Sequence, residues 1–412
     1  MQLVNHQYQI QGLNLTAICQ EFGTPLYIYD ADTILEKIQS LRTAFSGLPL
    51  RLKYAAKALT NISILKLMKS QQVGIDVVSI QEARLGLMAG FEPHEIMFTP
   101  NGVSFQEMQE AVELGINLGI DNLPMLEYFG QQYADTLSCS LRLNPHIVAG
   151  GNAKIQVGHI NSKFGISISQ LSQILDIVNK YNIKIAGLHI HTGSDLKDAD
   201  VFLQTAAILF DAAMQFKHLR FINFGGGFKV AYKKGDHTTN IHELGAKLKD
   251  AFLAFCDRYG RNLEIWFEPG KFLVSEAGLL LVKTNVVKKA PTTVFVQVDS
   301  GMNHLVRPMM YDAYHDMVNI SNPDGEHQEY TVVGYICETD TLGANRELNE
   351  VREGDIIAIK NAGAYGFSMS SNYNSRLRPA EVMIYKGQAK LIRKREELED
   401  LIKNQVVADW GN

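Results

Sequence analysis

The chain has 412 residues, of which 46% are hydrophobic and 20% are charged. This apolar content can form a large core, which excludes long disordered stretches, and the length suggests two domains or a barrel with a smaller companion. A net charge of −5 without a basic block argues against a nucleic-acid ligand and favours a small-molecule substrate.

The cysteines and the N-terminus indicate the cellular setting. Cys19, Cys139, Cys256 and Cys337 lie far apart without CxxC spacing, so neither a zinc site nor a disulfide framework is predicted. The first 13 residues lack the apolar core of a signal peptide, and no run approaches the ~18 apolar residues of a membrane span. We therefore expect a cytoplasmic protein that binds no membrane and no metal.

Short apolar runs alternate with segments of helical periodicity between about residues 47 and 268. The runs that we interpret as strands are 50–55, 74–78, 96–99, 117–120, 138–143, 183–189, 220–224 and 263–267. Alternation of strands and helices predicts parallel strands with crossover helices, and eight such units match a (β/α)8 TIM-like barrel of ~250 residues. A doubly wound open sheet stays the alternative, because periodicity does not show closure.

The sequence changes character after Gly270. The runs 279–287, 293–298, 330–337 and 355–359 are rich in strand formers and have no long helices between them, which predicts an antiparallel β domain. The expected fold class is thus α/β, with a barrel over 26–275 and a C-terminal β domain over 276–412. An N-terminal segment, 1–25, is expected to pack on the β domain.

In such barrels the functional residues follow the strands, at their C-terminal ends. Lys57 follows the first strand in KYAAKA, where a lysine alone is more often a solvated charge. His189 and His191, in HIHTGS, point the same way along a strand. No pattern of carboxylates or cysteines completes a metal site around them, so histidines satisfied by hydrogen bonds are the alternative.

Two further strand ends carry glycines and an acid. The glycines of NFGGGF, which are Gly225, Gly226 and Gly227, could close their backbone N–H groups around a phosphate, although a plain turn is an equal alternative. Glu268, in FEPGKF, needs a partner if it faces the barrel interior. A lysine, a histidine, a glycine loop and a carboxylate at one barrel mouth suit pyridoxal phosphate (PLP).

Ten sequence blocks, in this order along nearly the whole chain, resemble those of the fold-type III PLP-dependent amino-acid decarboxylases, above all those acting on diaminopimelate. The blocks are KYAAKA, GIDVVS with Glu82, LRLNP, SKFG, GLHIHTGS, FGGGF, EPGKF, VDSGMNHLVRPMMYDAYH, CETDT and GAYGFSMSSNYNSRLRPAEV. The resemblance implies a homodimer with active sites at its interface. It also implies conversion of meso-diaminopimelate to L-lysine and CO2, the last step of lysine biosynthesis.

The resemblance also implies roles for single residues around the cofactor. Lys57 would hold PLP covalently, and His191 would stack on its ring with His189 in support. Glu268 would pair with the pyridinium nitrogen and keep it protonated, which makes the ring an electron sink. The residues implied to bind the phosphate or frame the cofactor are Ser194, Gly225, Gly226, Gly227, Gly270 and Tyr373.

Substrate residues follow from the same resemblance. Arg307 and Tyr311 would hold a substrate carboxylate, with the arginine offering a bidentate fork. Cys337 and Glu338 would cross the dimer interface into the partner's site, where the carboxylate receives the distal amino group. The thiol is the candidate proton donor to Cα, with Lys57 as the alternative. Tyr373 would also contact the substrate. In the alternative readings of the residues alone, Cys337 is a buried thiol and Tyr373 a packing residue.

The chain departs from the family pattern at three places. Lys271, a candidate substrate residue, stands where the family commonly has arginine, and a lysine lacks the planar fork. CETDT replaces the common CESGD, which puts Asp340 at an unusual place, and Leu59 replaces an asparagine. The first two departures affect the substrate's distal end, where specificity is determined.

Other activities stay open at this point. A sibling decarboxylase for ornithine, arginine or carboxynorspermidine is the first alternative, although Arg307 favours a substrate with a second carboxylate. A racemase fits the CET and RPMMY blocks less well. A non-catalytic regulatory homologue is disfavoured by the presence of Lys57, the three glycines and Glu268. Arg142 could approach the cofactor or brace a loop, and Asp76 and Glu82 could be structural acids.

Overall fold

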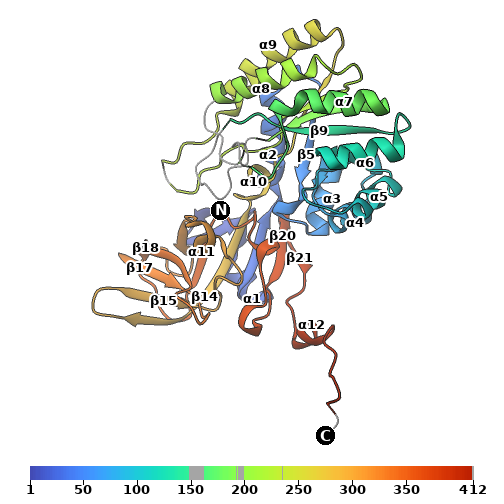
Figure 1. Ribbon diagram of the computed structural model, residues 1–412. Helices are drawn as coiled ribbons and strands as arrows, with labels where there is room; N and C mark the ends of the chain where they lie inside the picture. Colours follow the sequence, from blue (N-terminus) through green and yellow to red (C-terminus); the bar gives the residue numbers. More distant parts are fainter. Residues whose placement is uncertain (148–161, 192, 194–198, 234, 411–412) are drawn as a thin grey trace. The chain divides into compact units, whose positions relative to one another are not determined.

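A computed structural model of the chain describes residues 1–147, 162–191, 193, 199–233 and 235–410 (Figure 1). The chain forms two compact units, which we describe separately. The barrel unit comprises residues 35–231 and 235–273, and the β unit comprises residues 1–34, 232–234 and 274–412.

The barrel unit contains a closed ring of parallel strands. They are β5 (Leu50–Ala55), β6 (Gly74–Val77), β7 (Ile96–Phe98), β8 (Asn117–Ile120), β9 (Ser138–Asn144), β11 (Lys184–Ile190), β12 (Phe221–Asn223) and β13 (Glu264–Phe267). Pairing of β13 with β5 and of β8 with β9 closes the ring, and the short strand β10 (Ile166–Ser167) pairs in parallel with the end of β9. The predicted barrel is therefore confirmed, and the open sheet is excluded.

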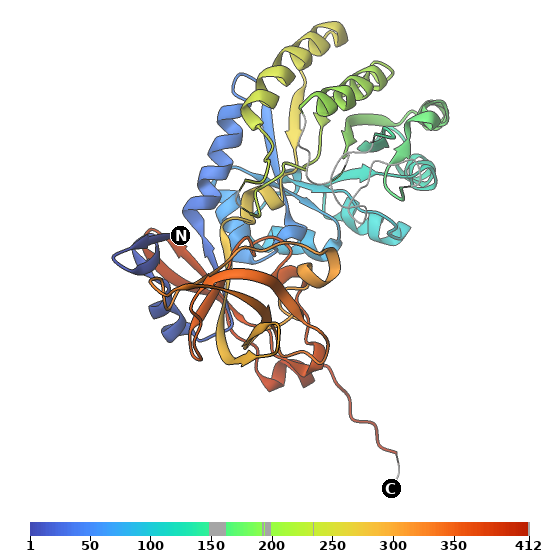
Figure 2. The ribbon, with the colours of Figure 1, turned by 90° about the vertical axis from the view of Figure 1, so that its left-hand side faces the viewer.

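Helices lie outside these strands, as Figures 1 and 2 show for α7 to α9. The helices are α2 (Ala31–Ala44), α3 (Ile62–Ser70), α4 (Ile80–Met88), α5 (Phe105–Glu113), α6 (Leu123–Tyr133), α7 (Leu171–Tyr181), α8 (Ala199–Ala213) and α9 (Ile241–Tyr259). Polar caps begin several of them; Ser104, for example, accepts from the Glu107 N–H at 3.1 Å. Inside the ring, the Phe221 and Trp266 rings stack with centroids 3.6 Å apart.

The β unit contains a nine-stranded sheet within the described residues. Its strands are β4 (Leu26–Asp30), β14 (Gly278–Lys289), β15 (Val294–Val298), β16 (Met317–Asn319), β17 (His327–Val333), β18 (Thr341–Asn349), β19 (Ile356–Ile359), β20 (Ala380–Tyr385) and β21 (Gln388–Arg393). Most pairs are antiparallel as predicted, but β4 with β20 and β15 with β17 are parallel, so the sheet is mixed.

The first domain boundary lies later in the chain than the sequence predicts, because strand β4 belongs to the β unit. Residues 26–30 were expected in the barrel, yet β4 pairs with β14 on one side and with β20 on the other. The β unit accordingly includes the chain up to residue 34, and it includes the chain again from residue 274 onward. The physical reason is that LYIYD is buried along its first four residues and needs hydrogen-bonded neighbours on both edges.

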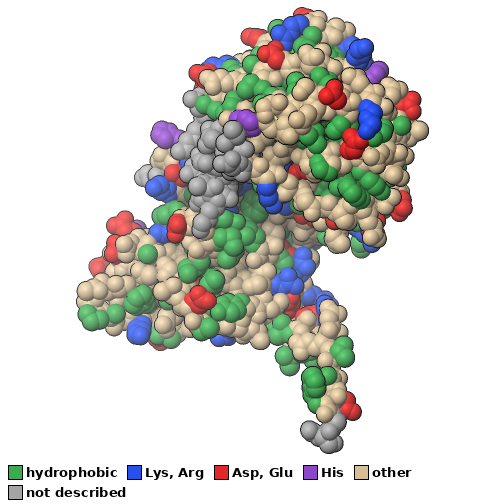
Figure 3. Space-filling view, in the orientation of Figure 1, with side chains coloured by type: hydrophobic (Ala, Val, Ile, Leu, Met, Phe, Trp, Pro, Cys, Tyr) green, Lys and Arg blue, Asp and Glu red, His purple; other side chains and the backbone are tan. Residues whose placement is uncertain are grey.

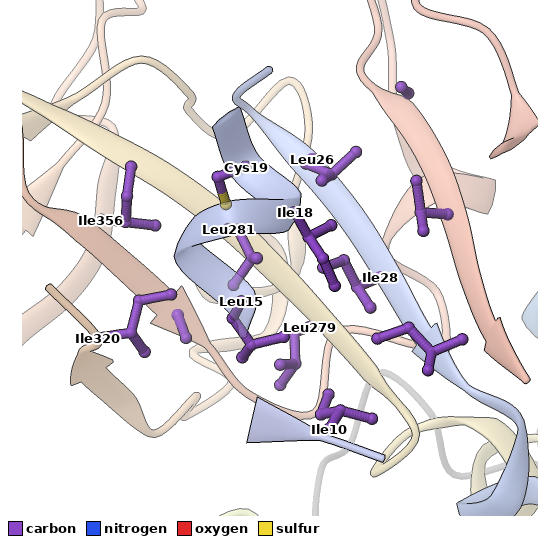
Figure 4. Close-up of a cluster of buried hydrophobic side chains, with 14 residues drawn as sticks. Ile10, Leu15, Ile18, Cys19, Leu26, Ile28, Leu279, Leu281, Ile320 and Ile356 are labelled. Atoms are coloured by element: carbon purple, nitrogen blue, oxygen red, sulfur yellow. The ribbon is translucent and has the colours of Figure 1, made fainter. Parts of the chain in front are cut away.

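The N-terminal segment packs on this sheet. It comprises β1 (Gln2–Val4), β2 (Gln7–Ile10), β3 (Leu13–Asn14) and α1 (Leu15–Phe22). Ile10, Leu15 and Ile18 lie against Leu279 and Leu281 in one buried cluster (Figure 4). The charged C-terminal stretch contains the short helix α12 (Leu398–Ile402), after which the last described residues run out in extended form (Figure 2).

The molecular surface carries both signs of charge. On the face shown in Figure 3, basic and acidic side chains are interspersed over the barrel unit rather than gathered in one patch. Within the described ranges, every helix is too short or too polar to cross a membrane.

Candidate active site

The C-terminal end of the barrel presents a lysine beside a buried acid. Lys57 lies in a single 3₁₀ turn, Ala56–Ala58, directly after β5, and its side chain is 43% exposed. Its Nζ is 3.7 Å from Oδ2 of Asp76, on β6, whose side chain is 1% exposed. A partly exposed lysine side chain thus lies beside a carboxylate that is shielded from water.

The Asp76 carboxyl has a higher pKa than is usual for an aspartate. Its Oδ1 accepts a hydrogen bond from the Thr99 hydroxyl, whereas its Oδ2 has no hydrogen-bond partner among the described residues. Burial, helped by the negative charge of Glu268, raises the pKa of Asp76 to about 7, against the opposing effect of Lys57. Asp76 can therefore gain or lose a proton near neutral pH.

This ionisation predicts a pH-dependent stability. A carboxyl whose pKa is raised on folding binds its proton more tightly in the folded state, so its stabilisation is lost as pH rises from about 4 to about 7. Between pH 5 and pH 8 we therefore expect the cofactor-free wild type to lose stability relative to Asp76→Asn. Thermal unfolding across this range measures the difference. The exposed Asp176→Asn variant is the control, and parallel curves for wild type and Asp76→Asn would contradict the assignment.

Glu268 is the second buried acid, and it directly follows β13. Asn223, the last residue of β12, donates from Nδ2 to Glu268 Oε1, and the His189 Nε2 atom lies 3.3 Å from Oε2. Burial raises the pKa of Glu268, and the Asn223 hydrogen bond opposes that rise. The Asn223 Oδ1 atom also accepts from the Gly225 N–H at 2.9 Å, so one asparagine fixes both the acid and the start of the glycine loop.

The surroundings of His189 and His191 disfavour their protonated forms. Burial lowers the pKa of both rings well below the ordinary histidine value, and the positive charges of Arg142 and Lys57 add to the effect. Neither ring nitrogen of His189 has a hydrogen-bond partner in the described part of the chain, and the same holds for His191 Nδ1. No three His, Cys, Asp or Glu side chains of the described residues gather as metal ligands would.

The loop after β12 requires glycine at each position for a geometric reason. Gly225 and Gly227 have φ angles of 66° and 101°, which disfavour side chains. A Cβ on Gly225 would lie 2.8 Å from His191 Nδ1, and a Cβ on Gly226 would lie 2.5 Å from the Glu268 carbonyl oxygen. The loop therefore packs its backbone closely against both the histidine and the acid.

The remaining barrel predictions have mixed outcomes. Ser194 lies outside the described residues. A Cβ on Gly270 would lie 3.1 Å from Ala55 Cβ, which places this glycine against the end of β5, and Lys271 begins the short helix α10 (Lys271–Val274). The Glu82 carboxylate accepts from the Val78 N–H at 2.9 Å, which is a structural role at the start of α4.

Arg142, on β9, interacts electrostatically with the buried acids of the barrel. Burial lowers the pKa of its guanidinium, and the nearby charges of Glu268, Asp121 and Asp76 oppose that shift. Its guanidinium also lies 4.8 Å from the centroid of the Phe164 ring. The sequence left its role open; the structure places its charge in the field of the two buried acids.

A second group of predicted residues gathers in the β unit. The Tyr373 hydroxyl donates to Glu338 Oε1 at 2.9 Å, and the Cys337 sulfur lies 3.2 Å from Nδ2 of Asn374. The hydrogen bond to Glu338, with Cys337 nearby, raises the pKa of Tyr373 to about 12. Cys337 is exposed, whereas the other three cysteines are buried. The alternative of a buried thiol at Cys337 therefore does not hold within this chain.

The backbone conformation and contacts of Asp340 account for the aspartate in the unusual CETDT block. It has a φ angle of 44°, and its carboxylate accepts from the Met302 N–H at 2.5 Å and from the Ile336 N–H at 2.8 Å. A Cβ on Gly301 or Gly334 would come within 2.4 Å of its Oδ2 atom. Asp340 thus points inward and closes the turn that carries Cys337 and Glu338.

Arg307 and Tyr311 are the first and last residues of helix α11 (Arg307–Tyr311). Arg307 is 8% exposed, and its Nε atom has no hydrogen-bond partner among the described residues.

Three polar residues that sequence reasoning did not single out are Thr99, Asn223 and Asn374. Their only signal was position, at a strand end or inside a matching block.

Comparisons with known proteins agree with these features. Residues 31–275 match the family model described as pyridoxal-dependent decarboxylase, pyridoxal binding domain. The chain is 35% identical to diaminopimelate decarboxylase of Methanothermobacter thermautotrophicus, over 97% of this chain and 95% of that one.

Solved structures agree as well. The crystal structure of diaminopimelate decarboxylase from Helicobacter pylori complexed with L-lysine has a TM-score of 0.86 at 33% identity, covering 95% of this chain and 98% of that one. The enzyme from M. jannaschii has a TM-score of 0.90 at 29% identity, covering 99% and 98%. The barrel, its strand-end acids and these full-length matches together place the chain in the pyridoxal-dependent decarboxylases, within the family of the diaminopimelate decarboxylases.

Proposed function

We propose that this protein decarboxylates meso-diaminopimelate to L-lysine and CO2 with PLP as its cofactor, in the last step of lysine biosynthesis. The observation that carries the proposal is the accessible Lys57 amine 3.7 Å from the buried Asp76, in the same barrel end as Glu268. The full-length similarity to diaminopimelate decarboxylases supports the substrate.

The residues at this barrel end fit PLP. Buried polar atoms of Asp76, His189 and His191 have no hydrogen-bond partner among the described residues, and the glycine loop has no side chains of its own. In this proposal Lys57 would hold the cofactor covalently, and Glu268 would pair with its ring nitrogen. The residues proposed for the ring face and the phosphate are His191, Ser194, Gly225, Gly226, Gly227, Gly270 and Tyr373. When bound, PLP supplies an electron sink for loss of the carboxylate.

The protein's own groups then control protons and orientation. Glu268 would hold a proton at the ring nitrogen, in a position fixed by Asn223. His191 can lie against the ring without adding charge, because burial keeps it neutral. Asp76, with a pKa of about 7, can exchange a proton with the Lys57 amine near neutral pH.

For the substrate, we propose roles for residues of the β unit and for Lys271. Arg307, Tyr311 and Lys271 would bind the carboxylate that is not lost. Cys337 would protonate the substrate Cα, and Glu338, held by Tyr373, would bind the distal amino group. We further propose a homodimer in which Cys337 and Glu338 serve the partner's active site, and a cytoplasmic location, where the Cys337 thiol stays reduced.

A substrate panel tests the proposed function. CO2 release is followed with meso-diaminopimelate, ornithine, arginine and carboxynorspermidine after loading with PLP. We expect kcat/KM for meso-diaminopimelate to exceed the others by about 10²-fold or more, because unpaired carboxylate-binding groups penalise simpler substrates. Faster reaction with ornithine or arginine would favour a sibling decarboxylase. A protein that binds no PLP would indicate a regulatory homologue.

A further inference from the structure

Tyr232 belongs to the β unit although its sequence lies between two barrel elements. It follows β12 and precedes α9, but it belongs by its contacts to the β unit. Its hydroxyl lies 3.3 Å from Ser275 Oγ, and its ring meets the His315 ring edge to face, with centroids 5.6 Å apart. The tyrosine is therefore held from two sides by residues of the β unit.

Tyr232 in turn contacts the side chain of Arg307 in two ways. The Arg307 Nη2 atom donates to the Tyr232 hydroxyl at 3.3 Å, and the guanidinium carbon lies 5.5 Å from the centroid of the Tyr232 ring. Both the hydroxyl and the face of one ring thus orient a single guanidinium. A side chain fixed in this way keeps its remaining N–H donors in a constant direction.

Among the residues that the structure describes, Arg307 has no charged partner. It is 8% exposed, its Nε atom has no hydrogen-bond partner, and no carboxylate of the described residues pairs with it. A buried guanidinium without an anion is unfavourable, because its lost hydration is not replaced. The arrangement therefore suits an anionic ligand, and a carboxylate matches the two-donor fork.

His315 supports this arrangement without competing for the anion. Its Nδ1 atom lies 2.8 Å from the Lys360 carbonyl oxygen, and burial lowers its pKa to about 4. The ring is therefore neutral near pH 7. It packs against Tyr232 and adds no positive charge beside Arg307.

We propose that Tyr232 is a positioning residue that orients Arg307 toward the carboxylate retained in the product, and so sets the preference for substrates that carry it. The inference rests on the proposed function. In meso-diaminopimelate the carboxylate at the D centre is lost, and the one at the L centre remains in L-lysine. Lys271 stands where the family commonly has arginine, so Arg307 supplies the planar fork and its orientation matters more.

The test compares two inhibitors that differ in this carboxylate. L-lysine carries it, whereas 1,5-diaminopentane lacks it. In the PLP-loaded Tyr232→Phe variant, we expect KM for meso-diaminopimelate and the inhibition constant of L-lysine to rise about 10-fold, as for a lost hydrogen bond to a charged group. The inhibition constant of 1,5-diaminopentane should change less than about 2-fold, and kcat less than about 3-fold, because uniform binding is what is lost.

Two controls separate positioning from a general structural effect. Tyr330→Phe removes another buried hydroxyl of the β unit, which donates to Gln328 at 2.9 Å, and should leave both inhibition constants unchanged. Tyr232→Leu also removes the ring and should weaken L-lysine further than Tyr232→Phe does. Equal changes for both inhibitors, or none, in Tyr232→Phe would overturn the inference. A wild type that neither turns over meso-diaminopimelate nor binds L-lysine would instead overturn the proposed function, and the inference with it.

Discussion

Replacing Lys57 with alanine should remove the covalently bound cofactor and lower the decarboxylation rate by about 10³-fold or more. The Lys57 side chain is 43% exposed after the end of β5, and its Nζ atom lies 3.7 Å from Oδ2 of Asp76. Alanine leaves no nucleophile at this place. The purified wild type should have a visible absorbance band that borohydride bleaches while fixing the cofactor to the Lys57 peptide, and the variant should have neither property.

The control for this result is Lys66→Ala, which removes an exposed lysine of helix α3. It should keep both the absorbance band and the rate. Lys57→Arg tests whether charge alone suffices; it should be inactive, because guanidinium stays protonated at neutral pH. Full turnover by Lys57→Ala would show that another group carries the cofactor.

Glu268→Gln should lower the decarboxylation rate by about 10²- to 10³-fold without destabilising the cofactor-free protein. The activity falls because the neutral amide no longer holds a proton on the ring nitrogen. The stability is kept because glutamine has the same size and its oxygen can still accept from Asn223. Burial raises the pKa of Glu268, so the ionised carboxylate disfavours the folded state above its unfolded pKa, and the amide is free of that cost.

Steady-state kinetics with saturating PLP and thermal unfolding at pH 8 measure the two effects. Glu264→Gln, at the first residue of β13, provides the control: its carboxylate pairs with Arg51 on the surface and should matter little for the rate. Unchanged kinetics in Glu268→Gln would remove this residue from the proposed cofactor site. A large drop in melting temperature would show that the carboxylate is structurally required.

The barrel was predictable because each of its strands is a short buried run set between helical patterns. The predicted run 183–189, for example, differs by one residue from β11. The β unit was less predictable, since its strands pair across long sequence separations. Residues 341–349 form β18 although most of that strand is half-buried or exposed, so the run lacks a continuous apolar signal.

The residues of the site likewise divide into those that the sequence predicts and those that it does not. Lys57, Glu268 and the glycines stand directly after strands, and barrel geometry alone brings such positions together. The role of Asp76 was not predictable, because its raised pKa depends on burial and on Glu268, nearly 200 residues away in sequence. The Tyr232 contact with Arg307 is equally hidden, because a loop that follows a barrel strand joins the other unit.

The position of β4 has a consequence for how the protein is made. This strand, Leu26–Asp30, lies between β14 and β20 in the sheet, so one of its edges stays open until residues 380–384 have been synthesised. The barrel strands, in contrast, come from one stretch of the chain and can pair while translation continues. We expect the emerging chain to form its cofactor-binding barrel first. The sheet that carries Arg307 and Cys337 is completed last, when the ribosome releases the C-terminal strands.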